Sequence, residues 1–222
     1  MKVRVSLLMP SRGRFELAKK SVESLGPGSY EVLIGVDPDD PELASYKTLK
    51  SKNIKVVEFD KRYGYQQLHI YYNHLASMAK GDWIMLWNDD AVKEKPDWIE
   101  AITNYNHQKP IVLSPYHPID NLFPVLSRKW YQLIGHYSLS THVDSWVQNI
   151  GSYCNNQVPI LGVSIKHEGE KLNDQTHKEV RDVVRQTSEH HRSPEAVALR
   201  EQEAKLIANY MIEQGYRYEN NN

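Results

Sequence analysis

The sequence predicts an α/β fold in which a mixed β-sheet is flanked by helices and followed by a helical C-terminal extension. The first observation is that, over the first hundred residues, short β-rich apolar stretches alternate with stretches of helical periodicity. Such alternation is typical of parallel strands joined by helices that cover both faces of a sheet. The second is that strand-like stretches beyond residue 106 are short and mixed with helices, and the third is a long amphipathic stretch near the end.

Four apolar stretches of the first half are expected to be β-strands, at 3–9, 32–36, 54–59 and 83–87. Between and after them, apolar residues recur every three or four positions, which places them on one face of a helix. These helices are expected at 15–25, 43–50, 68–79 and 96–105. Glycine and proline mark several boundaries, since Gly81 ends the third helix and Pro96 suits the first turn of the fourth.

The second half is expected to contain short strands at 111–113, 123–127 and 163–167 and helices at 143–150, 176–185 and 193–214. The last helix has the clearest ends, because Ser193 suits the N-cap, Pro194 the first turn and Gly215 the stop. Its apolar stripe is expected to pack on the domain and consists of Val197, Ala204, Ile207 and Met211. We expect a solvated linker at 190–191, which is a histidine pair, and a disordered tail at 220–222.

Composition restricts the class of protein. The 222 residues are 40% hydrophobic and 25% charged with a net charge of -1, which is globular and gives no global basic field for nucleic acid. The single cysteine, Cys154, allows neither an internal disulfide nor a cysteine zinc cluster, which fits a reducing compartment. The sequence shows no signal-peptide pattern and no apolar run of about 20 residues that could span a membrane. A cytoplasmic location is therefore expected.

Asn88, Asp89 and Asp90 directly follow the strand at 83–87, at the end of the sheet where α/β proteins bind their ligands. Adjacent carboxylates at this place suit a hard divalent cation, which often bridges a carboxylate and the phosphates of a substrate. The same residues also suit an ordinary polar turn, because Asn and Asp are common turn formers. The triplet by itself leaves both interpretations open.

Arg12 and Arg14 follow the first strand and precede the first helix. Guanidinium groups and the N-terminus of a helix both favour anions, so this turn is expected to contact a diphosphate. The alternative is a solvated basic turn at the start of a helix. Neither a Walker A loop nor a Gly-x-Gly-x-x-Gly loop occurs, which argues against an ATPase and against a dinucleotide-dependent oxidoreductase.

Four motifs carry a resemblance to a known family. They are, in chain order, Pro-Ser-Arg-Gly-Arg at 10–14, Val36-Asp37 at the end of the second strand, a helix with Asn73, and Lys-Gly-Asp-Trp-Ile-Met-Leu-Trp-Asn-Asp-Asp at 80–90. This arrangement resembles the nucleotide-binding half of family 2-like GT-A glycosyltransferases. The resemblance covers 3–105 well and 106–170 loosely.

The resemblance implies one GT-A domain at 1–170 and a helical extension at 171–222. Within the domain, 1–105 would be the nucleotide-binding half and 106–170 the acceptor half. The donor, a nucleotide diphosphate sugar and more specifically a UDP-sugar, would be held by residues of each motif: Pro10, Ser11, Arg12, Arg14, Asp37, Asn73, Asn88 and Asp89. Among these, Asp37 would contact the base or the ribose.

The family's Asp-x-Asp metal motif corresponds to Asn88-Asp89-Asp90 in this chain. Asp90 stands at the position that usually contacts the metal, whereas Asn88 replaces the first Asp and so leaves one charged motif position. Some members add a histidine, and His167 at the end of the strand at 163–167 would take that place with Mn²⁺ or Mg²⁺. A lone histidine more often has no such role, and that alternative stays open.

Two further residues are given roles by the resemblance. Tyr63, in Arg-Tyr-Gly-Tyr at 62–65, would stack on the base, although an ordinary glycine turn explains the motif equally well. Asp144 lies where the family carries an acidic residue near the acceptor, and an inverting transferase needs a carboxylate to take the proton of the acceptor hydroxyl. The alternative for Asp144 is the N-cap of the helix that follows it.

The sequence thus predicts a metal-dependent glycosyltransferase that moves a sugar from a nucleotide diphosphate sugar to a hydroxyl acceptor, with inversion if Asp144 is the base. The small size also resembles glycosyltransferase-like proteins of phages, which would place the protein in the host cytoplasm. The acceptor would then be a glycan or a hydroxymethylated base in DNA. Two alternatives remain, namely a nucleotidyltransferase and a non-catalytic module that binds a sugar or nucleotide.

Overall fold

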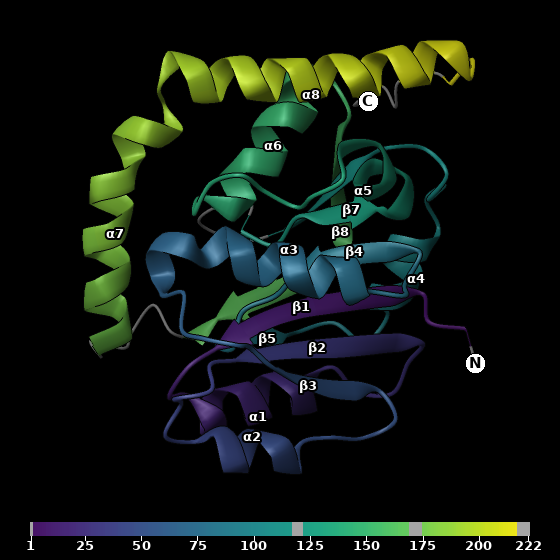
Figure 1. The fold of residues 1–222 in the computed structure, drawn as a ribbon. Helices are drawn as coiled ribbons and strands as arrows, with labels where there is room; N and C mark the ends of the chain where they lie inside the picture. The colour runs from purple at the N-terminus through teal and green to yellow at the C-terminus, as the bar shows by residue number, and fades with distance from the viewer. Residues whose placement is uncertain (1, 117–121, 169–174, 217–222) are drawn as a thin grey trace.

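The computed structural model describes residues 2–116, 122–168 and 175–216, which form a curved sheet covered by helices (Figure 1). The strands of the described residues form one eight-stranded sheet in the order β3-β2-β1-β4-β7-β6-β8-β5. The tail that is expected to be disordered, at 220–222, lies outside the described residues.

The four strands predicted for the first half are present and parallel: β1 (Val5–Ser11), β2 (Tyr30–Val36), β3 (Ile54–Glu58) and β4 (Trp83–Leu86). Helices cover the sheet from two sides. In Figure 1, α1 (Phe15–Ser24) and α2 (Leu43–Thr48) lie below the strands, whereas α3 (Leu68–Met78) lies above them and packs on β1. Because β1 and β4 are covered on both faces, nearly all of their side chains are buried.

The second half makes the sheet mixed. It adds β5 (Ala91–Lys93), β6 (Val112–Tyr116), β7 (Val125–Ser127) and β8 (Gln157–His167). Strand β7 is antiparallel to β4 and β6, and β8 is parallel to β6. Strand β5 follows the triplet at 88–90 directly and pairs antiparallel with the end of β8. A helix, α4 (Trp98–Thr103), then packs against β8. The sequence predicts that this helix begins at Pro96, and it begins two residues later.

Three further helices lie above the sheet in Figure 1: α5 (Arg128–Ile134), α6 (Val143–Tyr153) and α8 (Pro194–Glu213). Helix α7 (Gln175–His191) stands at the left of the molecule. Helix α8 crosses α5 and α6, and α7 contacts the short helix η1 (Tyr65–Gln67) that precedes α3. The predicted packing of the α8 stripe is confirmed for Ala204, Ile207 and Met211, which are buried. Ser193 caps α8 as predicted, because its side chain accepts a hydrogen bond from the Ala196 N–H.

The expected solvated linker at 190–191 is wrong for His191. Helix α7 continues through His191, and the corner between α7 and α8 folds onto α6. The His191 side chain is consequently buried, 4.7 Å from the ring of His142 and edge-on to Trp146. His190 remains exposed.

None of the described helices is long and apolar enough to cross a membrane.

Candidate functional site

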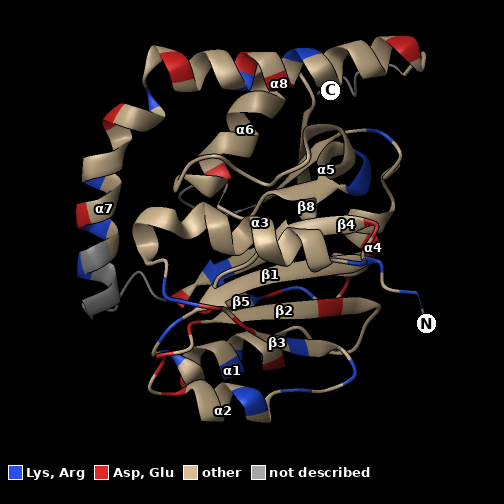
Figure 2. Ribbon diagram, in the orientation of Figure 1, with Lys and Arg blue, Asp and Glu red and all other residues tan. Residues whose placement is uncertain are grey.

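A cavity of about 220 Å³ opens at the carboxyl ends of β1, β2 and β4. Acidic and basic segments meet at this end of the sheet (Figure 2). Nine of the residues that the sequence indicates as site residues line it: Pro10, Ser11, Arg12, Arg14, Asp37, Asn88, Asp89, Asp90 and His167. The parallel strands explain this convergence, because their carboxyl ends meet at one edge of the sheet.

The turn after β1 is fixed by contacts with residues that follow β2 and β4 and with Tyr46 of α2. The Ser11 hydroxyl donates to Asp89 Oδ2 at 2.7 Å and lies 2.7 Å from the Tyr46 hydroxyl, which accepts from the Arg14 N–H at 3.0 Å. Gly13 has a φ of +60°, which favours glycine, and its N–H donates to Asp40 Oδ2 at 2.9 Å. The turn is therefore held in one conformation before any ligand binds.

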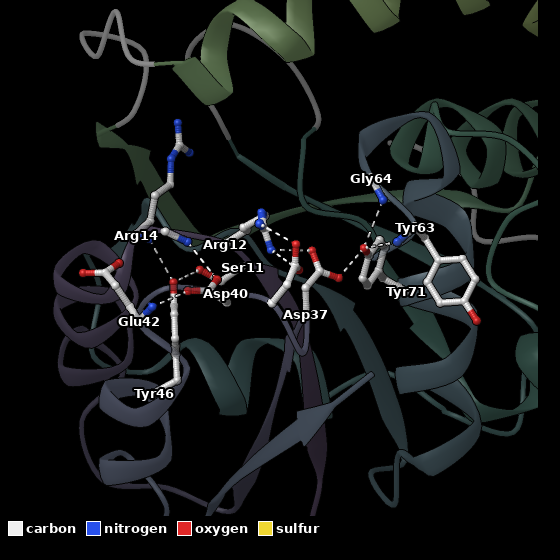
Figure 3. Close-up of polar contacts among 12 residues, drawn as sticks. Ser11, Arg12, Arg14, Asp37, Asp40, Glu42, Tyr46, Tyr63, Gly64 and Tyr71 are labelled. Carbon is white, nitrogen blue, oxygen red and sulfur yellow. Dashed lines mark hydrogen bonds and ion pairs between the residues drawn. The ribbon is translucent and has the colours of Figure 1, made fainter. Parts of the chain in front are cut away.

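The two arginines of this turn point in different directions (Figure 3). Arg12 donates to both oxygens of Asp39, at 2.7 and 3.1 Å, and to Asp37 Oδ2 at 3.3 Å. Arg14 lies at the triplet instead, with Nη1 3.4 Å from Asp89 Oδ1 and 3.6 Å from Asp90 Oδ2. Of the two arginines, only Arg14 thus places its positive charge beside Asp89 and Asp90.

Asp37 forms the second part of the site, directly after β2. Its carboxylate is buried, and burial raises its pKa, an effect that the Tyr71 hydrogen bond and the Arg12 charge oppose. The Tyr71 hydroxyl donates to Asp37 Oδ1 at 2.5 Å and accepts from the N–H groups of Tyr63 and Gly64 at 2.8 and 3.1 Å (Figure 3). Tyr71 therefore fixes both Asp37 and the loop on the far side of the cavity.

The triplet after β4 forms the third part. Asp89 is buried, and burial together with the adjacent charge of Asp90 raises the pKa of Asp89 to about 6. Asn88 Oδ1 accepts from the Tyr72 hydroxyl at 3.3 Å, which directs its amide nitrogen toward His167 Nε2, also at 3.3 Å. The Asp90 carboxylate is buried, with Oδ1 2.7 Å from His167 Nε2.

Strand pairing, and not sequence proximity, brings His167 to Asp90. Strands β5 and β8 pair with Ala91 opposite His167, and the Glu168 N–H donates to the Asp90 carbonyl at 2.8 Å. The ring of Phe123 packs edge-on against the ring of His167, with 5.9 Å between the two ring centres. The imidazole is thus held between an aromatic ring and the carboxylate.

Seven lining residues are not predicted from the sequence: Arg62, Gly64, Tyr65, Leu68, Tyr71, Tyr72 and Val180. All but Val180 come from the segment between β3 and the middle of α3, and Val180 comes from α7. A sequence signal existed for some of them, because Arg62-Tyr63-Gly64-Tyr65 lies in the loop after β3. Val180 had none, since only the fold brings α7 beside η1.

Tyr63 and Asn73 lie outside the cavity lining. The Tyr63 hydroxyl donates to the exposed Asp60 at 2.9 Å, and the aromatic ring of this loop that lines the cavity belongs to Tyr65. Asn73 uses both ends of its amide to hold the loop before α6: Nδ2 donates to the Ser138 carbonyl at 2.8 Å, and Oδ1 accepts from two backbone N–H groups. These contacts join α3 to the loop before α6.

Asp144 also lies outside the cavity lining, in the first turn of α6. Its alternative role as N-cap is wrong, because the helix begins at Val143 and His142 is the N-cap. Asp144 Oδ1 accepts from the Ser145 N–H at 2.8 Å. Burial and then the negative charge of Asp144 raise the pKa of Tyr65, so Asp144 is within electrostatic range of the cavity wall.

Among the described residues, no three His, Cys, Asp or Glu side chains form a group that could hold a metal ion. Asp90 and His167 nevertheless place two donor atoms side by side on the cavity wall. Magnesium-like ions at phosphate substrates are commonly held by one or two protein groups, with phosphate oxygens and water as the other ligands. The pair fits a metal of that kind and not one enclosed by protein alone.

By sequence, no protein-family model matches the chain and no curated protein matches it. By structure, it is similar to a mannosyltransferase from Pyrobaculum calidifontis, PcManGT, in complex with GDP-Man and Mn²⁺. The TM-score is 0.62 and the identity 13%, over 98% of this chain and 77% of that one. It is also similar to residues 1–349 of TarS from S. aureus in complex with UDP, with a TM-score of 0.59 and 13% identity over 95% and 72% of the chains. The chain therefore has the GT-A fold, as the sequence predicts.

Proposed function

We propose that the protein is a glycosyltransferase that moves a sugar from a nucleotide diphosphate sugar to a hydroxyl group of an acceptor. One observation carries the proposal: the ends of four strands, β1, β2, β4 and β8, bring the 10–14 turn, Asp37 and the Asp90–His167 pair to one cavity on a GT-A fold. Two of the solved structures that this fold resembles were determined with GDP-Man and with UDP. Asp37 would contact the nucleoside of such a donor, Arg14 would lie at its diphosphate, and the Asp90–His167 pair would hold a metal ion there.

The nucleoside is assigned to the side of the cavity that contains Asp37 and Tyr65. Asp37 already accepts one hydrogen bond at each oxygen, and each oxygen has a second lone pair for a ribose hydroxyl or a base N–H. The Tyr65 ring provides a face on which a base can stack. A cavity of about 220 Å³ is smaller than most small-molecule sites, so the sugar would extend beyond it.

The diphosphate is assigned to the opposite side, between Arg14 and the triplet. Asp90 and His167 would hold Mn²⁺ or Mg²⁺, which when bound would neutralise the charge that develops on the departing diphosphate. Arg14 adds a fixed positive charge at the same place. Asp89, buried between Ser11 and Arg14, fixes the turn and the arginine.

In the transfer step, the acceptor oxygen attacks the anomeric carbon, the bond from that carbon to the diphosphate breaks, and the acceptor proton passes to a base. We assign the base to Asp144, whose charge acts on Tyr65 in the cavity wall. Attack from the side opposite the diphosphate then inverts the anomeric centre. The acceptor hydroxyl is assigned to a glycan, and a hydroxymethylated DNA base is the other class that the sequence resemblance suggests.

A non-catalytic module that binds a nucleotide or sugar is the second candidate. It is favoured by the replacement of the first motif Asp by Asn88 and by the lack, among the described residues, of a three-ligand metal group. Such a module would bind the donor in the same cavity but leave the glycosidic bond intact.

The test is release of nucleoside diphosphate from a panel of UDP- and GDP-sugars with Mn²⁺, with water as the acceptor. We expect one sugar donor to be hydrolysed, and Asp90→Ala to abolish the release. Asp182→Ala is the control, because Asp182 is an exposed carboxylate on α7 and lies outside the cavity lining. Donor binding without release from any member of the panel would favour the module, whereas no binding would contradict both candidates.

A further inference from the structure

A second cavity, of about 400 Å³, lies at the corner where α7 meets α8 above α6. It shares no lining residue with the cavity at the strand ends. Its lining is almost entirely polar, and it contains two arginines and two histidines but no aspartate or glutamate. None of these residues is used by the proposed glycosyl transfer.

Arg200 of α8 is the most unusual residue of this cavity, since only 2% of it is exposed. Its Nη1 donates to the His191 carbonyl at 2.9 Å, its guanidinium lies 5.0 Å from the Trp146 ring centre, and its buried Nε has no hydrogen-bond partner. Among the described residues, no carboxylate pairs with it. Burying a charge without a partner of opposite sign is strongly unfavourable, so the site lacks a negative charge.

The buried carboxylate of α8 does not supply that charge, and the adjacent Glu201 is exposed. Glu203 is one turn further along α8, but Oε1 lies 2.9 Å from His136 Nε2 and Oε2 accepts from Trp146 Nε1 at 3.0 Å. Both oxygens are thus engaged by residues that do not line the cavity. Arg192 adds a second positive charge, because its exposed side chain also lines the cavity.

We propose that this cavity binds a phosphate ester carried by a hydroxyl-rich molecule. Guanidinium groups match phosphate oxygens with two parallel hydrogen bonds, and the two arginines provide two such groups. The neutral lining, with Ser145, Asn149 and Ser188, offers partners for hydroxyls. The volume is within the range of small-molecule sites and exceeds what a bare phosphate needs. The inference does not depend on the proposed transfer.

The test is calorimetric titration with and without UDP in excess, so that any binding in the strand-end cavity is recognised as the part that UDP removes. Three probes are used: glycerol 3-phosphate, inorganic phosphate, and glycerophosphoglycerol, which is the diester. We expect glycerol 3-phosphate to bind at least about tenfold more tightly than inorganic phosphate, since each factor of ten needs only the energy of one or two hydrogen bonds. A preference for the monoester points to a free metabolite or a chain end, and a preference for the diester points to a phosphodiester polymer.

Replacing the two arginines that line the cavity tests whether the probes bind there. Arg192→Gln is expected to weaken it about tenfold and Arg200→Met to abolish it, whereas Arg185→Gln, an exposed arginine of α7 outside the cavity lining, is expected to have no effect. Arg192 is exposed, so its replacement tests the site even if Arg200→Met does not fold. Equal binding by wild type and Arg192→Gln, or no binding of any probe at millimolar concentration, would overturn the proposal. Equal affinity for inorganic phosphate would overturn the hydroxyl-rich carrier.

Discussion

Asp90 Oδ1 lies 2.7 Å from His167 Nε2, and this contact joins the end of β4 to the end of β8. It depends on the antiparallel pairing of β5 with β8, which places Ala91 opposite His167. The contact lies on the wall of the cavity that also contains Asp37 and Arg14.

His167→Ala is expected to remove the effect of Mn²⁺ on UDP affinity and to leave UDP binding without metal nearly unchanged. The reason is that the variant removes one of two protein donors at the metal position, and loss of a partner at a metal site costs about tenfold or more in affinity. Calorimetric titration of UDP with and without Mn²⁺ measures this. His190→Ala, which removes an exposed histidine, is the control. Full metal enhancement in His167→Ala would exclude His167 as a ligand.

Tyr65→Ala is expected to weaken UDP binding by about tenfold, because a base that stacks on an aromatic ring gains about 1–3 kcal/mol. Tyr63→Ala is the matched comparison, since Tyr63 is on the same loop but outside the cavity lining. Its replacement should change the dissociation constant of UDP little. If the larger loss occurred in Tyr63→Ala, the stacking residue would be Tyr63, as the sequence resemblance implies.

Tyr71→Phe is expected to lower the free energy of unfolding by about 1–3 kcal/mol, because the change leaves buried polar groups without their partner. The hydroxyl that is lost serves Asp37 and two backbone N–H groups. Urea denaturation measures the effect. Tyr63→Phe removes only a hydroxyl bonded to the exposed Asp60 and should change stability by less than about 0.5 kcal/mol. Similar losses in both variants would mean that the Tyr71 network does not stabilise the loop.

Asp144→Asn is expected to reduce the rate of sugar transfer at least about a hundredfold while the affinity for the donor stays the same, because an amide cannot accept the proton. The amide oxygen can still accept from the Ser145 N–H, so the start of α6 should remain intact. Single-turnover rates with the acceptor, once one is found, measure the effect. Unchanged transfer by the variant would remove Asp144 from the mechanism, and with it the argument for inversion.

Acid is expected to destabilise the protein through His191. Burial, followed by nearby positive charge, lowers its pKa to about 4 from 6.5, and the charged or titratable groups that face it are Arg200, His142, Arg192 and His190. The unfolded chain then binds more protons than the folded one between pH 6.5 and 4, so stability falls as the pH falls through this window. At pH 5 the loss due to this residue is about 2 kcal/mol.

Chemical denaturation of wild type and His191→Gln, at pH 7.5 and pH 5 in a buffer without phosphate, isolates this contribution. The variant should lose less stability than wild type between the two pH values, whatever its stability at pH 7.5. Equal losses would show that His191 does not titrate differently on unfolding.

Local sequence patterns were sufficient to predict the strands and helices of the first half of the fold and the residues at the ends of those strands. Asp37 and Asp90 could be expected at one edge because parallel strands have a fixed direction, and that direction follows from the β-α alternation. The short strand β5 had no such signal: three residues carry too little periodicity, and its partner β8 is far away in the sequence. His167 could therefore be placed beside Asp90 only by family resemblance.

Orientation within a loop was the other feature that the sequence could not provide. Tyr63 and Tyr65 flank one glycine and are chemically identical, and only the packing of Tyr63 against Phe59 and Tyr71 decides which ring lines the cavity. Asn73 had a recognisable position on α3, yet its role depends on backbone groups at 137–138 that no pattern connects to it. The burial of His191 likewise depends on the corner between α7 and α8 packing on α6.

The central claim is that Asp90 and His167 belong to a site for a nucleotide diphosphate and a divalent metal. Its most direct test is calorimetric titration of UDP and GDP into wild type and Asp90→Ala, each with and without Mn²⁺. We expect one of the two nucleotides to bind wild type more tightly with Mn²⁺, and Asp90→Ala, folded as judged by circular dichroism, to lose that increase. Failure of both nucleotides to bind wild type at millimolar concentration, or an equal Mn²⁺ effect in Asp90→Ala, would contradict the claim.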